Sequence, residues 1–97
     1  MRVTIGGKRW NREFVRIRPR TGEEFADNGN IDSPDTRQKK IRINRTLRGE
    51  KRLDTIIHEI LHAADWNKDE SWIEEISTDI ARILTKLGYT NSGKKDE

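Results

Sequence analysis

The sequence has 97 residues, no cysteine and a net charge of +3. It leaves room for one small domain, expected to span residues 1–97, and excludes disulfide bonds, thiolate metal sites and cysteine nucleophiles. Because no segment approaches the roughly 20 apolar residues that cross a bilayer, and the N-terminus lacks the apolar core of a signal peptide, we expect a soluble cytoplasmic protein with no membrane partner.

Residues 1–45 predict a small, strand-rich antiparallel sheet. Apolar residues alternate with polar ones in three short segments, and turn-forming residues separate these segments. The alternating residues are Val3 and Ile5, Val15 and Ile17, and Ile41 and Ile43, and the turns are Gly6-Gly7, Asn28-Gly29 and SPDT at 33–36. This pattern predicts an antiparallel meander of about three to five short strands.

The strand-rich part is also strongly basic. Residues 1–52 carry 15 lysines and arginines against 7 acidic residues, a net charge of +8, whereas residues 53–97 carry 5 against 10, a net charge of −5. Such a surface could bind the phosphates of nucleic acid. The candidate phosphate contacts are Arg16, Arg18, Arg20, Arg42 and Arg45. Since the arginines alternate with apolar residues, as on the solvated face of a sheet, a solvent-facing surface is the favoured interpretation.

Residues 46–88 predict two helices, because the apolar residues change to a period of 3.6. The first helix is expected from Gly49 to Asp65 and the second from Lys68 to Leu87, followed by a polar tail over residues 89–97. The apolar stripes are Leu53, Ile57, Ile60, Leu61 and Ala64 in the first helix, and Trp72, Ile73, Ile76, Ile80, Ile83, Leu84 and Leu87 in the second. A short loop joins the helices, so we expect them to pack antiparallel.

The first helix carries both histidines of the chain, His58 and His62, in the segment TIIHEILHAADW. Residues i and i+4 of a helix point the same way, so the two imidazoles can bind one Zn²⁺ while Glu59 acts as general base on a water molecule. The alternative is that the spacing arose by chance. On a wheel centred at Ile57, Glu59 is then an ordinary solvent-facing residue.

A third zinc ligand must be a carboxylate, because the chain has no cysteine and no third histidine. On a wheel of the second helix centred at Ile76, Glu74 faces solvent, whereas Glu75 and Asp79 flank the apolar stripe. We therefore predict Glu75 as the third ligand. Asp79, one turn further on, is then expected to accept a hydrogen bond from the free ring nitrogen of a ligating histidine.

The segments HEILH at 58–62 and EISTD at 75–79 resemble the HExxH and ExxxD motifs of the gluzincin metallopeptidases, the thermolysin-like zincins. The layout is also similar to that of small metallopeptidase-like chains encoded by phages. The resemblance covers roughly residues 29–87 and implies a zincin-like α+β fold with one zinc ion. It gives His58, His62 and Glu75 as ligands, Glu59 as the base and Asp79 as the residue that orients a histidine.

The resemblance also implies a substrate site. Zincins place an edge strand before the HExxH helix, where the segment Ile41, Arg42, Ile43 and Asn44 would hold an extended peptide by main-chain pairing. Gluzincins stabilise the tetrahedral intermediate with a further histidine or tyrosine, and Tyr89 is the candidate here, with an arginine as the alternative. The expected function is zinc-dependent hydrolysis of a peptide or protein substrate. The alternative is a small nucleic-acid or protein-binding module with a structural or vestigial zinc site.

Overall fold

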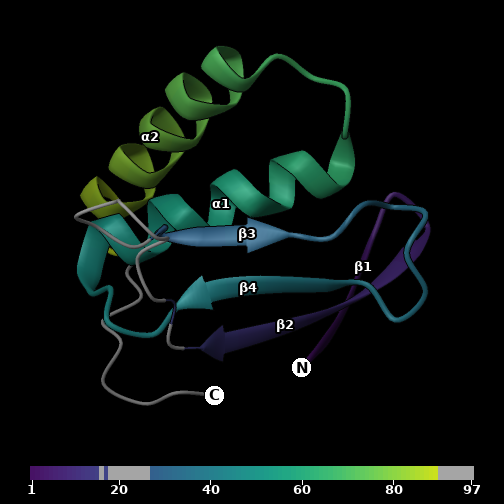
Figure 1. Cartoon of the computed structure of the whole chain (residues 1–97). Coiled ribbons are helices and arrows are strands. Elements are labelled where there is room, and N and C mark those ends of the chain that lie inside the picture. The colour runs from purple at the N-terminus through teal and green to yellow at the C-terminus, as the bar shows by residue number, and fades with distance from the viewer. Residues whose placement is uncertain (16, 18–26, 90–97) are drawn as a thin grey trace, which may run out of the picture.

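The described part of the chain forms three layers: a four-stranded sheet, a helix that covers the sheet, and a second helix outside the first (Figure 1). The computed structural model describes residues 1–15, 17 and 27–89. The elements are β1 (Arg2–Ile5), β2 (Lys8–Val15), β3 (Gly29–Ile31), β4 (Lys40–Asn44), α1 (Gly49–Ala64) and α2 (Glu70–Lys86). The predicted α+β class is confirmed, and both helices begin and end within two residues of their predicted bounds.

The strands lie in the order β1-β2-β4-β3. β1 and β2 form an antiparallel hairpin, and its turn residues Gly6 and Gly7 have φ values of 58° and 78°, which glycine adopts without strain. β3 is antiparallel to β4, but β2 and β4 are parallel. The sheet is therefore mixed, and the prediction of an antiparallel sheet is wrong for this pair. The alternation of apolar and polar residues could not reveal this, because it is the same in strands of either direction.

β4 lies inside the sheet, between β2 and β3. The prediction that Ile41–Asn44 forms an edge strand for substrate is therefore wrong, because β2 and β3 already occupy its two sides. The strand that directly precedes the HExxH helix in the chain was expected at the edge of the sheet, but it is not the outermost strand. β3 is the edge strand on this side of the described sheet, and it runs alongside α1 (Figure 1).

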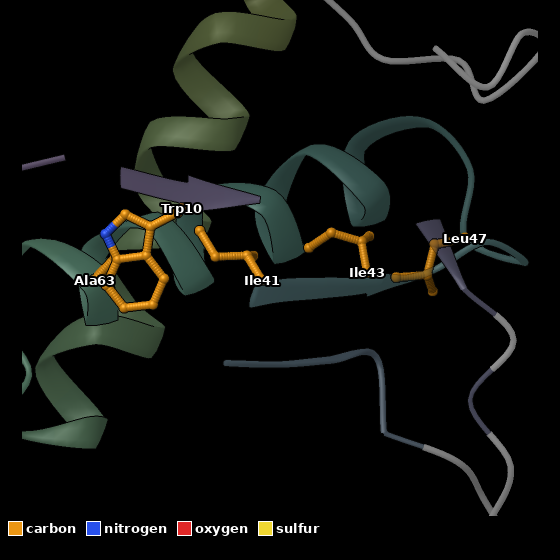
Figure 2. Packing of buried hydrophobic residues seen from close by; sticks show 5 residues of the cluster. All are labelled: Trp10, Ile41, Ile43, Leu47 and Ala63. Carbon is orange, nitrogen blue, oxygen red and sulfur yellow. The ribbon is translucent and has the colours of Figure 1, made fainter. Parts of the chain in front are cut away.

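The core lies between the sheet and α1, around the apolar side chains shown in Figure 2. Ile41 and Ile43 of β4 are almost fully buried and contribute about 1.5–3 kcal/mol each to folding. Trp10, Leu47 and Ala63 complete this cluster. On the other face of β4, Arg42 donates to Asp32 over 2.8 Å. The prediction that Ile41 and Ile43 lie on one buried face of this strand is thus confirmed, whereas Arg42 is only partly exposed and is paired with Asp32.

The face that α1 turns toward the sheet is more polar than its sequence suggests. Its buried residues are Arg52, Thr55, Glu59 and Ala63. The Arg52 guanidinium lies 3.8 Å from the centre of the Phe14 ring, a cation–π contact. Glu59 therefore lies near the centre of the buried face. The alternative of a chance HExxH pattern, in which Glu59 faces solvent, does not agree with this position.

α2 packs against α1 through one large and two small residues. Its buried positions are Ile73, Ser77 and Ala81, and the two small residues let the helix axes approach closely. Across this contact, Asp54 of α1 accepts hydrogen bonds from the hydroxyls of Ser77 (2.9 Å) and Thr78 (2.8 Å). Within the described ranges, neither helix is both long and apolar enough to cross a membrane.

Candidate metal centre

His58 and His62 lie one turn apart on α1, and the helix directs both rings the same way. Their centroids are 4.8 Å apart and their Nε2 atoms 3.1 Å apart. Both side chains are largely buried, with exposed fractions of 20% and 17%. The expectation that the HExxH spacing brings the two imidazoles together is confirmed by this geometry.

The third member of the group is Glu70, in the first turn of α2. Its Oε1 lies 2.9 Å from Nε2 of His58 and its Oε2 lies 2.8 Å from Nε2 of His62. Two imidazoles and this carboxylate form the group that could hold a metal ion. Ligands about 2.0–2.1 Å from a tetrahedral zinc ion are about 3.3 Å apart. The observed spacings are slightly shorter, and small outward movements would fit them to such an ion.

The group suits either hydrogen bonds or a metal ion. Without a metal ion, both imidazoles can donate their Nε2 protons to the Glu70 carboxylate, one to each oxygen, over 2.9 and 2.8 Å. With a cation between the three side chains, both unprotonated Nε2 atoms and the carboxylate would each offer it a lone pair.

We name His58, His62 and Glu70 the triad. Glu59 lies beside the triad and is 6% exposed. Burial, together with the negative charges of Glu70 and Asp27, raises the pKa of Glu59 from 4.5 to about 7. The backbone of Gly29 in β3 passes so close that a Cβ there would lie 3.1 Å from Oε2 of Glu59. The edge strand therefore passes close beside the acidic side chain.

Two cavities flank the triad. One, of about 490 Å³, is lined by β3, both histidines, Glu59, Glu70 and Trp66. The other, of about 480 Å³, lies between the two helices and is lined by His58, Glu59 and Glu70 together with further polar residues. Those further residues include Asn28, Lys51, Asp54, Glu74 and Thr78. His58 and Glu70 thus line both cavities, whereas His62 lines only the first.

Glu75, the predicted third ligand, is exposed and is not part of the group. The prediction of Glu75 is wrong because it assumed that Ile76 lies at the centre of the side of α2 that faces α1. The side of α2 that faces α1 is centred on Ser77, about 100° from Ile76, and this rotation turns Glu75 to solvent while it brings Glu70 and Glu74 to the cavity side. Ile76, Ile80 and Ile83 dominated the apolar pattern, whereas the buried positions are Ile73, Ser77 and Ala81.

The same rotation displaces Asp79. Its side chain is 52% exposed and lies 3.6 Å from Arg82 on the surface of α2, so the predicted hydrogen bond to a ligating histidine is absent from the described structure. Tyr89, the predicted transition-state donor, is 65% exposed and follows the far end of α2. Since α2 rises about 24 Å from Glu70 to Lys86, Tyr89 is far from the triad. Both predictions are wrong.

Glu70 is the residue that the sequence analysis missed, and a signal for it was present. The loop between the helices spans only residues 65–69. A connection this short brings the first turn of α2 beside the last turn of α1, where His62 lies. An acidic residue in that first turn was therefore the better candidate than one in the middle of the helix.

The chain matches no protein-family model, no curated protein and no solved structure. The resemblance to gluzincins consequently rests on HExxH alone, since the residues of the ExxxD segment lie away from the histidines. What the molecule itself provides is a group of two histidines and a glutamate able to hold a metal ion.

Proposed function

We propose that the chain is a zinc-dependent peptidase whose metal ligands are His58, His62 and Glu70. The observation that carries this proposal is the convergence of the three side chains: the two Nε2 atoms are 3.1 Å apart, and each lies 2.8–2.9 Å from one carboxylate oxygen of Glu70. Two imidazoles and one carboxylate are a donor set of catalytic zinc sites, which leave a fourth position open. Zinc at this site would polarise the scissile carbonyl and lower the pKa of water.

Glu59 is proposed as the general base. It is the residue after the first ligand, it lines both cavities, and no hydrogen bond within the described residues occupies its carboxylate. In the reaction Glu59 accepts a proton from the attacking water, whose oxygen bonds to the carbonyl carbon. It then delivers that proton to the amine nitrogen as the C–N bond breaks. The products are a carboxylic acid and an amine.

The substrate strand is β3 in this proposal. Asn44 donates its N–H to the Asn28 carbonyl (2.7 Å), and Asp32 donates to the Lys40 carbonyl (3.0 Å). In an antiparallel pair every second residue directs its N–H and C=O groups toward the neighbouring strand. Asn28 and Asp32 are such residues, so the backbone groups of Gly29 and Ile31 point away from β4. An extended peptide could pair with these groups and pass beside Glu59 and the triad.

The nucleic-acid alternative receives less support. Of its five candidate arginines, Arg16, Arg18 and Arg20 lie outside the described residues. Arg42 donates to Asp32 over 2.8 Å, so its charge is already compensated. The main alternative to a peptidase is a protein whose metal site is only structural. The two hypotheses differ in the role of Glu59.

Cleavage of a broad peptide library by purified protein tests the proposal. We expect hydrolysis that a chelator abolishes and that added zinc restores. Protein that contains zinc in a one-to-one ratio but cleaves no peptide under any condition would contradict the peptidase and support a structural metal site.

A further inference from the structure

The outer side of α2 carries apolar residues that the described part of the fold leaves uncovered. Within the described residues α2 packs against α1 and against no strand, and Figure 1 shows it as the outermost layer. Ile83 and Leu87 are 56% and 68% exposed, and Ile76 and Ile80 are only partly buried. We name Ile76, Ile80, Ile83 and Leu87 the α2 stripe. A contiguous apolar stripe on so small a protein usually marks an interface.

The α2 stripe lies on the opposite flank of the helix from the metal centre. With Ser77 facing α1, Glu74 lies about 60° to the cavity side and Ile80 about 60° to the other side. Ile60 of α1, 36% exposed, extends the apolar surface on that other side. A partner that covers the α2 stripe would therefore leave the triad and its cavities open.

The spacing of the α2 stripe is symmetric. Its residues follow one another at intervals of four, three and four, so the pattern reads the same in both directions about a point between Ile80 and Ile83. An antiparallel copy of the helix placed on a two-fold axis at this point sets Ile76 opposite Leu87 and Ile80 opposite Ile83. Every residue of the α2 stripe then meets an aliphatic partner, as a self-complementary two-fold interface requires.

The charges beside the α2 stripe have the same complementarity. Glu75 and Asp79 precede its midpoint, whereas Arg82 and Lys86 follow it. In the antiparallel arrangement Asp79 lies within about 3 Å, measured along the axis, of the level of Arg82 and Lys86 in the other copy. Glu75 reaches the level of the same Lys86. A parallel arrangement would instead place acidic residues at the level of acidic ones and basic residues at the level of basic ones.

We propose that a second copy of this chain covers the α2 stripe and forms a two-fold dimer through antiparallel α2 helices. The contact spans about three turns of one helix in each copy, which is less than a permanent dimer buries. The dimer is therefore reversible, and its population rises with protein concentration. This inference does not depend on the proposed function.

Sedimentation velocity over a range from low micromolar to submillimolar concentration tests the dimer. Wild-type protein is expected to pass from monomer to dimer. Ile83→Glu should raise the dissociation constant roughly a hundredfold, because both copies lose a buried isoleucine. Trp66→Glu, an equally drastic change at an exposed residue away from α2, should leave association unchanged. Melting curves of both variants verify that each is folded.

A mixing experiment tests the antiparallel register. The double variant Glu75→Lys, Asp79→Lys and the double variant Arg82→Glu, Lys86→Glu each place like charges across the interface and should be monomeric alone. Mixed in equal amounts, they should dimerise. Wild-type protein that stays monomeric at the highest concentration would overturn the proposal. A dimer unaffected by Ile83→Glu would overturn it as well.

Discussion

Oε2 of Glu70 lies 2.8 Å from Nε2 of His62, across the loop that joins the two helices. The loop is short, so this contact between the start of one helix and the end of the other follows from the antiparallel packing of α1 and α2. The group that could hold a metal ion therefore depends on how the two helices pack. Changes that loosen the pair should therefore weaken metal binding even when they touch no ligand.

The first prediction concerns the third ligand. Glu70→Ala should abolish high-affinity zinc binding, because it leaves only two imidazoles, whereas Glu75→Ala should bind zinc as the wild type does, because Glu75 is exposed and outside the group. Calorimetric titration of zinc into metal-free protein measures both. Loss of binding in Glu75→Ala with retention in Glu70→Ala would mean that α2 is rotated from the orientation described above.

The second prediction concerns metal removal. Zinc that binds only the folded state stabilises it by about 2.7 kcal/mol when free zinc exceeds the dissociation constant a hundredfold. Chelation should therefore lower the melting temperature by roughly 10 °C or more in a chain of this size. Glu70→Ala is the control and should melt at the same temperature with and without chelator. If wild-type melting does not change although elemental analysis shows that the metal was removed, the ion is not part of the folded structure.

The local pattern of the sequence was sufficient for the histidine pair and for both helices, because those features depend on residues a few positions apart. The i, i+4 spacing alone directs His58 and His62 to one side. The rotation of α2 about its own axis, in contrast, depends on which of its sides packs best against α1. Ser77 and Ala81 decide that by allowing close approach, and a scale that weights large apolar side chains cannot detect it.

Strand order was the second feature that the sequence did not reveal. β2 and β4 pair in parallel, and β3 lies outside β4, although β3 comes first in the chain. The alternation at Ile41 and Ile43 identifies a strand and its buried face. The alternation does not show which strand lies beside this one, because strands pair through backbone hydrogen bonds that nearly every residue can form.

The third prediction concerns Gly29. A Cβ there would lie 2.9 Å from the Arg42 carbonyl oxygen, 3.0 Å from Cγ2 of Thr55 and 3.1 Å from Oε2 of Glu59. Gly29→Ala should cost about 1–3 kcal/mol of stability, since β3 must move away from α1. Urea denaturation measures the loss. A Gly29→Ala variant as stable as wild type would argue against close packing at Gly29.

The fourth prediction concerns acid. A hydrogen bond from Arg42 holds the pKa of Asp32 below its ordinary value, against the opposing effect of burial. The ionised pair therefore stabilises the fold above about pH 4, the unfolded-state pKa of aspartate, and this contribution is lost as the pH falls through the lower pKa of the native state. Asp32→Asn should be about 0.5–1 kcal/mol less stable than wild type at neutral pH.

The difference between wild type and Asp32→Asn should then shrink as the pH falls below about 4, because protonated aspartic acid and asparagine are both neutral. Urea denaturation at a series of pH values measures it, with Asp35→Asn in the same connection as the exposed control. A difference that stays constant through acid would show that Asp32 acts through something other than its charge.

The fifth prediction separates a peptidase from a structural metal site, and it is measured on Glu59→Gln. The change removes the proposed base but keeps the size of a side chain that is 6% exposed, and it leaves His58, His62 and Glu70 in place. Zinc content and peptide cleavage should be determined on the same preparation, beside wild type. We predict zinc occupancy equal to wild type and loss of cleavage by at least about a hundredfold. Cleavage at the wild-type rate by zinc-loaded Glu59→Gln would contradict the assignment of Glu59 as the base, and with it the proposed mechanism.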